Sequence, residues 1–125
     1  VNSNYTARKL IDELEAKDTL KVLWDPGNNC WCHERAYPDG YDEVRGGYLG
    51  HIHIKDVYVD TPRATLELRK MGSGQLGPLF QPMADALRKD GYQDVISFES
   101  VYHPGNGDFE AGFRDCIGTF KQIFG

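Results

Sequence analysis

The chain has 125 residues, of which 40% are hydrophobic and 12% aromatic, and its 14 Lys and Arg against 19 Asp and Glu give a formal charge of −5. This composition supports a packed core, excludes general disorder and argues against a protein whose main partner is a nucleic acid. No stretch approaches the roughly 18 apolar residues of a membrane helix. The N-terminus carries neither a basic nor an apolar leader region, so we expect a cytoplasmic protein with no membrane partner.

The cysteine content agrees with that expectation. Cys30, Cys32 and Cys116 are an odd number, and two of them are one residue apart. This number and spacing do not favour a set of structural disulfides, and they predict that the thiols are reduced.

Helical and strand patterns alternate along the chain. Apolar residues at helical spacing predict the helices, and short apolar runs that end at polar, proline or glycine residues predict the strands. In chain order we expect a helix (5–17), a strand (20–24), a long loop with one short helical segment (26–46, with the helix at 39–45), a strand (48–54), an excursion hairpin (57–71), a helix with its apolar stripe at 80–87, a strand (94–99) and a last helix (109–124). This order predicts a parallel sheet with helical crossovers, hence an α/β fold without an internal linker.

All three predicted strands of the sheet end in a side chain that can ligate a metal. These residues are Asp25, His53 and Glu99. The carboxyl ends of parallel strands open onto the same side of a sheet, so these groups are expected to lie together. Two carboxylates and an imidazole match the ligands preferred by Mn²⁺, Mg²⁺, Co²⁺ or Zn²⁺. The alternatives are structural: a turn residue for Asp25, a hydrogen-bonded histidine for His53, and a capping or ion-paired group for Glu99.

The same residues carry a family resemblance over most of the chain. The ordered motifs are Trp24–Asn28, Gly50–Asp56, Gly72–Gly74, Gly91–Tyr92 and Ile96–Glu99. This set resembles the C-terminal part of the xylose isomerase-like TIM barrels, a superfamily that holds sugar phosphate isomerases and epimerases and AP endonuclease-type proteins. The resemblance implies that residues 1–125 form one partial domain, about three βα units corresponding to strands 6–8 of a (β/α)8 barrel.

The resemblance also implies roles for the three strand-end residues. Asp25, His53 and Glu99 would ligate a divalent metal ion, and Glu99 would also be a catalytic acid or base. In the epimerases of the family a glutamate from the fifth strand is the fourth ligand and the partner of the residue matching Glu99. One removes a proton beside a carbonyl, the other returns it, and the metal holds the enediolate oxygens. That partner would lie upstream of residue 1.

Two positions depart from the best-known epimerases. Where these enzymes carry a histidine three residues after the metal aspartate and an arginine six residues after the metal histidine, this chain has Asn28 and Val59. Asn28 can still bind a sugar hydroxyl, whereas Val59 cannot. Ketohexose epimerisation is therefore disfavoured, and inosose dehydration or another isomerisation stays open. The nuclease branch uses additional His and Asp residues that have no counterpart in this sequence.

Other polar and aromatic residues near these motifs are candidate substrate contacts. Lys55 and Asp56 are expected at the mouth of the site, where contact with a substrate anion and an ordinary ion pair are equally compatible with the sequence. Trp31 is a candidate wall of the substrate pocket. His103 is either exposed or in contact with substrate, and His51 is either a packed residue or one that orients a metal ligand.

Two further motifs favour structural interpretations. A zinc site at Cys30–His33 is disfavoured, because structural zinc sites use four ligands and commonly a wider cysteine spacing. Gly72 and Gly74 are expected to be turn glycines with positive φ, because the motif is isolated and lacks the other features of a phosphate-binding loop.

The sequence thus leads to one main hypothesis and one of a different class. The first is a metal-dependent isomerase or epimerase acting through an enediolate on a small sugar, inosose or hydroxy-carbonyl compound, with an inosose dehydratase-like lyase as a variant. The second is a noncatalytic half-barrel that serves binding or assembly. In either case, exposed strand edges would need a partner, either the missing N-terminal half of the barrel or a second copy of the chain.

Overall fold

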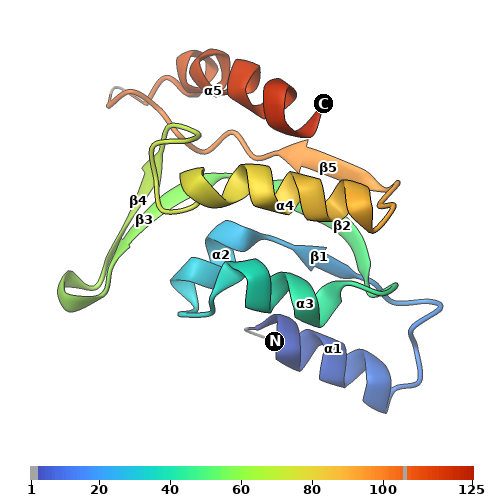
Figure 1. Cartoon of the computed structure of the whole chain (residues 1–125). Helices are drawn as coiled ribbons and strands as arrows, with labels where there is room; N and C mark the ends of the chain where they lie inside the picture. Colours follow the sequence, from blue (N-terminus) through green and yellow to red (C-terminus); the bar gives the residue numbers. More distant parts are fainter. Residues whose placement is uncertain (1–2, 106) are drawn as a thin grey trace.

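A three-stranded parallel sheet organises the computed structural model, which describes residues 3–105 and 107–125 (Figure 1). The strands are β1 (Val22–Trp24), β2 (Leu49–Ile54) and β5 (Val95–Phe98), in the order β1-β2-β5. Leu23 pairs with His51, and His51 pairs with Val95, so the three residues form one row across the sheet. The expected parallel α/β arrangement is confirmed.

Helices connect the strands and cover one face of the sheet. They are α1 (Asn4–Glu13), α2 (Pro26–Trp31), a helical segment (Ala36–Gly40) that leads into α3 (Tyr41–Val44), α4 (Gly77–Lys89) and α5 (Phe109–Phe124). The core lies between this layer and the strands, where Trp24, Ile52 and Phe80 are fully buried. None of the helices in the described ranges has both the length and the apolar character needed to cross a membrane.

The helix ends follow local signals in the sequence. The Ser3 hydroxyl accepts a hydrogen bond from the backbone N–H of Thr6, and the Thr6 hydroxyl accepts one from the N–H of Ser3, so α1 begins with a capping box. It ends four residues earlier than predicted because the chain turns at Glu15, where φ is +51°. Gly91, with φ +71°, follows the end of α4 as predicted.

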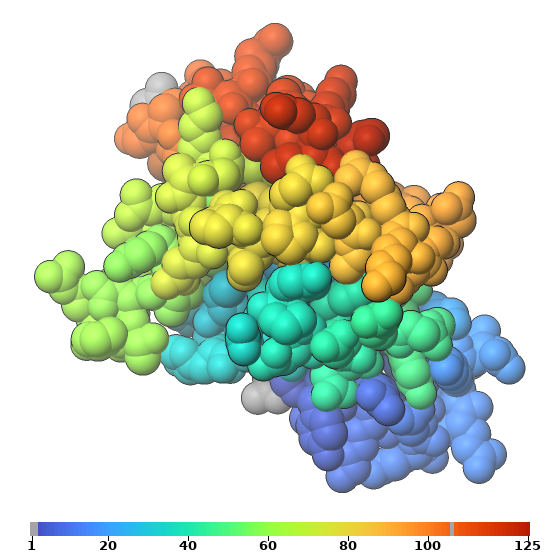
Figure 2. Space-filling view, in the orientation of Figure 1, coloured from blue at the N-terminus to red at the C-terminus, as the bar shows by residue number. Residues whose placement is uncertain are grey.

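The expected excursion after the second strand is a β-hairpin. It comprises β3 (Asp56–Asp60), a helical turn (Thr61–Arg63) and β4 (Thr65–Arg69), with antiparallel pairing throughout. The hairpin projects from the rest of the chain at the carboxyl end of β2, as Figures 1 and 2 show. It is therefore positioned to form one side of any site at the strand ends.

The predicted loop over 26–46 is wrong in its first part. Helix α2 begins immediately after Asp25, with proline at its first position, where a missing backbone N–H costs no helical hydrogen bond. The helical segment and α3 replace much of the remaining loop and overlap the predicted helix at 39–45, which ends one residue earlier, at Val44. Proline and glycine end β1 here by starting a helix rather than an irregular loop.

The opposite face of the sheet has no helical cover within the described residues. Side chains alternate along the strands, so Ile52 and Ile54 are buried while His51 and His53 face the other side and remain half-exposed. In the same row as His51, the side chains of Leu23 and Val95 are 49% and 60% exposed. This uncovered face carries apolar groups beside the histidines.

Candidate metal centre

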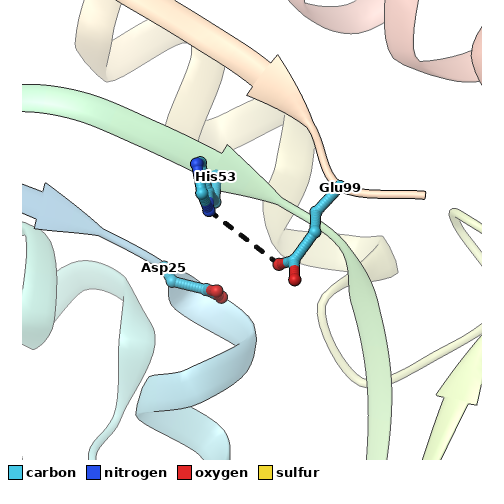
Figure 3. A group of neighbouring side chains, drawn as sticks. All are labelled: Asp25, His53 and Glu99. Atoms are coloured by element: carbon cyan, nitrogen blue, oxygen red, sulfur yellow. Dashed lines mark ion pairs between the residues drawn. The ribbon is translucent and has the colours of Figure 1, made fainter. Parts of the chain in front are cut away.

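Asp25, His53 and Glu99 come together at the carboxyl ends of the three parallel strands (Figure 3). One potential ligand atom from each residue lies within 4.8 Å of the others. His53 Nδ1 is 4.0 Å from Glu99 Oε2. Asp25 is buried, and the side chains of His53 and Glu99 are each 34% exposed. Two carboxylates and one imidazole within this distance suit a hard or borderline divalent cation.

Asp25 uses its two carboxylate oxygens differently. Oδ1 accepts a hydrogen bond of 3.0 Å from the backbone N–H of Asn28, which makes Asp25 the N-cap of α2. Oδ2 faces the other strand-end residues, where it lies 2.6 Å from Lys55 Nζ. One oxygen of Asp25 therefore has a structural role and the other remains at the candidate centre, so the turn role and the ligand role that the sequence offered as alternatives for Asp25 do not exclude each other.

His53 and Glu99 are oriented by the strands that carry them. The backbone N–H of Glu99 donates to the carbonyl of Ile54 at 2.9 Å, which extends the parallel hydrogen bonding one residue beyond β5. The ring of His51 meets that of His53 edge to face, with centroids 4.8 Å apart. His51 Nε2 is also 2.8 Å from Ser97 Oγ. His51 therefore packs beneath His53 and is tied to β5.

Lys55 lies between the two carboxylates of the candidate centre. Its Nζ donates to Asp25 Oδ2 at 2.6 Å and to Glu99 Oε2 at 2.7 Å, and its side chain is 10% exposed. Burial by itself lowers the pKa of Lys55, but the hydrogen bonds and negative charges of Asp25 and Glu99 outweigh this and raise that pKa above its ordinary value. Lys55 is thus a charged ammonium in contact with two candidate ligands.

Asp56 does not lie at the mouth of the site as an exposed ion-pairing group. It is 2% exposed, and its carboxylate accepts four backbone hydrogen bonds. The donors are the N–H groups of Val57, Gly72, Gly74 and Leu76, at 2.8–3.1 Å. Burial raises the pKa of Asp56, and the four donors oppose that rise. Asp56 therefore anchors the segment that leads into α4.

Glycine is required at the two glycine positions of the Gly72–Gly74 motif for different reasons. Gly72 has φ +89°, as predicted for a turn glycine. Gly74 is not among the residues with positive φ; a Cβ at this position would instead collide with the Asp56 carboxylate and approach the Val57 carbonyl oxygen to 2.5 Å. The prediction of positive φ is therefore wrong for Gly74, whose small size allows its backbone to reach Asp56.

Three of the four predicted substrate contacts line one cleft beside the centre. Asn28, Trp31 and Lys55 line an open cleft of about 230 Å³ together with Val57, Leu66 and Leu68 of the hairpin. Trp31 is 53% exposed. The lining thus combines Asn28 and Lys55, two polar residues that contact Asp25, with apolar residues of the hairpin.

The side-chain contacts of His103 are with its own loop and with the first residue of α5. Its Nδ1 accepts hydrogen bonds of 3.2 Å from the backbone N–H groups of Gly105 and Gly107, and its ring packs edge to face against Phe109. The structure therefore gives His103 a role in shaping the loop after Glu99. Its contact with substrate stays a prediction.

A buried polar network behind the centre was not anticipated. The indole N–H of Trp24 donates to Asn29 Oδ1 at 2.6 Å, and Asn29 Nδ2 donates to Glu34. Glu34 also accepts the backbone N–H of Asn4 at the start of α1. These bonds connect β1, α2 and α1.

The aspartate–proline pair at 25–26 was a usable signal for α2, since it matches an N-cap followed by proline at the first helical position.

The three cysteines are free thiols in the described structure. Cys116 is buried, Cys30 is half-buried and Cys32 is exposed. Burial raises the pKa values of Cys30 and Cys116. Within the described ranges, the single group of three or more potential metal ligands is that of Asp25, His53 and Glu99, which includes none of the cysteines.

The fold and the site define an α/β protein of the parallel type with candidate metal ligands at the carboxyl edge of its sheet. A family model described as xylose isomerase-like TIM barrel matches residues 1–122, so the chain belongs to this family. No curated protein and no solved structure gives a significant match. The family resemblance seen in the sequence motifs is thereby confirmed at the level of the family.

Proposed function

We propose that the chain contributes the metal-binding edge of a sugar isomerase or epimerase-like enzyme that acts through an enediolate. The observation that carries this proposal is the approach of Asp25, His53 and Glu99 to within 4.8 Å at the ends of three adjacent parallel strands. This donor set fits Mn²⁺, Mg²⁺, Co²⁺ or Zn²⁺. A bound divalent ion would supply Lewis acidity for a carbonyl and its neighbouring hydroxyl oxygen.

The remaining roles follow from the geometry of this chain. Glu99, a half-exposed carboxylate, moves a proton at the carbon beside the substrate carbonyl. Asn28 and Trp31 bind and orient the substrate in the adjoining cleft, which Lys55 also lines. His51 holds the ring of His53 in place through edge-to-face contact. The proposed substrate is a small sugar, inosose or hydroxy-carbonyl compound, and loss of water from an inosose by the same proton removal is the variant outcome.

The metal assignment can be tested by direct binding. The unsubstituted chain is expected to bind about one Mn²⁺ or Co²⁺ per molecule, and the Asp25→Asn/His53→Ala double variant is expected to lose at least about a hundredfold in affinity, because two of three ligands are removed. Isothermal titration and metal analysis after dialysis measure this. Asn at position 25 retains the oxygen that caps α2. Equal metal content in both proteins would contradict the assignment.

We further propose that β1, β2 and β5 correspond to the sixth, seventh and eighth strands of a barrel whose other strands cover the exposed face. The support is the row of Leu23, His51 and Val95, whose apolar members are 49% and 60% exposed. In a closed barrel such a row faces the interior. The upstream half of the barrel is the proposed occupant, and it would bring the fourth ligand.

This placement predicts how the 125-residue chain behaves alone. Without covering strands it is expected to self-associate through the uncovered face, because apolar side chains and strand edges remain accessible. Light scattering during size exclusion should give a mass that rises with concentration, and Leu23→Lys/Val95→Lys should return it toward that of one chain. A strictly monomeric unsubstituted chain at high concentration would contradict the placement. A self-associating chain that binds no metal would instead favour the noncatalytic assembly module.

A further inference from the structure

The ammonium of Lys55 takes up the carboxylate oxygens that a metal ion at this centre would use. It donates to Asp25 Oδ2 at 2.6 Å and to Glu99 Oε2 at 2.7 Å, and Glu99 Oε2 is also the oxygen nearest to His53 Nδ1. Hydrogen bonds between charged groups at these distances are strong. Lys55 thus neutralises part of the negative charge at the centre and keeps the carboxylates at the ends of β1 and β5 close together.

The path of the Lys55 side chain is built into the fold. Gly27 lies in the first turn of α2, and a Cβ at this position would lie 2.9 Å from Lys55 Cγ and 3.0 Å from Lys55 Cε. Gly27 is not among the residues with positive φ, so its backbone conformation does not require glycine. The missing side chain makes room for the aliphatic part of Lys55, which is an independent indication that this position of Lys55 is a built feature.

We infer that Lys55 is a resident cation that a divalent metal ion displaces. This inference rests on the proposed function of the centre. A carboxylate oxygen can bind a metal ion and accept a hydrogen bond at once, but the Lys55 ammonium lies between these two oxygens, so a metal ion bound to both would lie directly beside it and the two positive charges would repel strongly. Metal binding therefore exchanges one cation for another at the carboxylates, and no covalent bond changes. The displaced ammonium remains at the cleft that Lys55 lines together with Asn28 and Trp31, where it can bind an anionic or carbonyl oxygen of the substrate.

The exchange has a measurable cost in metal affinity. We compare Mn²⁺ binding by the unsubstituted chain, Lys55→Met and the control Lys89→Met, which removes the same charge from an exposed position at the end of α4. Lys55→Met is expected to bind Mn²⁺ at least about tenfold more tightly, because no bound cation has to leave, whereas Lys89→Met should match the unsubstituted chain. Equal or weaker binding by Lys55→Met would overturn the inference.

A second measurement separates displacement from a general effect of charge. The unsubstituted chain is labelled with an amine-reactive reagent with and without Mn²⁺, and modification of Lys55 is followed by peptide mass spectrometry. We expect labelling of Lys55 to become at least about fivefold faster with Mn²⁺, while labelling of Lys89 stays constant. Gly27→Ala should raise Lys55 labelling without metal, because the added methyl group crowds the side chain out of its path. Lys55 labelling that does not respond to bound Mn²⁺ would overturn the inference and leave the metal centre intact; absence of Mn²⁺ binding in every variant would overturn both.

Discussion

Replacing Asp56 with alanine is expected to lower the free energy of unfolding by about 4 kcal/mol, because several buried N–H groups lose their acceptor together. The carboxylate of Asp56 is 2% exposed and accepts hydrogen bonds from Val57, Gly72, Gly74 and Leu76. Alanine removes the acceptor of all four N–H groups, of which those of Val57 and Leu76 donate to Asp56 in buried hydrogen bonds. Urea unfolding followed by circular dichroism measures the change.

Two further variants serve as controls for this prediction. Asp18→Ala removes an exposed carboxylate and should change the free energy of unfolding by less than about 0.5 kcal/mol. Gly74→Ala should approach the effect of Asp56→Ala, because the new methyl group collides with the same carboxylate. If Asp56→Ala were as mild as Asp18→Ala, the hydrogen bonds to Asp56 would not anchor the segment between β4 and α4.

Replacing Gly112 with alanine is expected to lower the free energy of unfolding by about 3 kcal/mol through overpacking. Gly112 is buried in α5, and a Cβ there would collide with the backbone carbonyl oxygen of Tyr102. Backbone cannot move aside as a flexible side chain can, so α5 has to shift away from the segment that follows Glu99. Thermal and urea unfolding report the loss of stability.

The same helix provides a matched control with the opposite sign. Gly118 is exposed in α5, and a Cβ there meets no atom within 4 Å. Gly118→Ala should therefore raise the free energy of unfolding by about 0.5–1 kcal/mol, since alanine is the better helix former. Equal effects at positions 112 and 118 would show that helix propensity, rather than contact with Tyr102, governs α5.

The order of the elements was predictable because each has a local signal. Apolar spacing identified α1, α4 and α5, and short apolar runs ending at polar residues identified the three parallel strands. Helix α2 was missed because its residues, Pro26–Trp31, have low helix propensity. Contacts outside the helix stabilise it instead, chiefly the hydrogen bond that Asn29 accepts from the indole of Trp24 and the one that it donates to Glu34.

The approach of Asp25, His53 and Glu99 followed from their positions at the ends of parallel strands, which geometry brings to one edge. The environments of Lys55 and Asp56 could not be predicted in this way. Both residues follow β2, yet their side chains take different directions. Lys55 contacts the carboxylates of Asp25 and Glu99, whereas Asp56 accepts hydrogen bonds from backbone N–H groups 16–20 residues further along the chain. Such choices depend on loops whose paths only the folded chain specifies.

The divided carboxylate of Asp25 restricts which residue this position can tolerate. One oxygen holds the start of α2, which requires a short side chain, while the other faces Lys55 and the neighbouring ligands, which requires a negative charge. Glutamate would keep the charge but reach too far to cap the helix, and asparagine or serine would keep the cap but not the charge. Aspartate alone meets both conditions. Homologues should therefore show fewer residue types at position 25 than the capping role alone, or the charge alone, would permit.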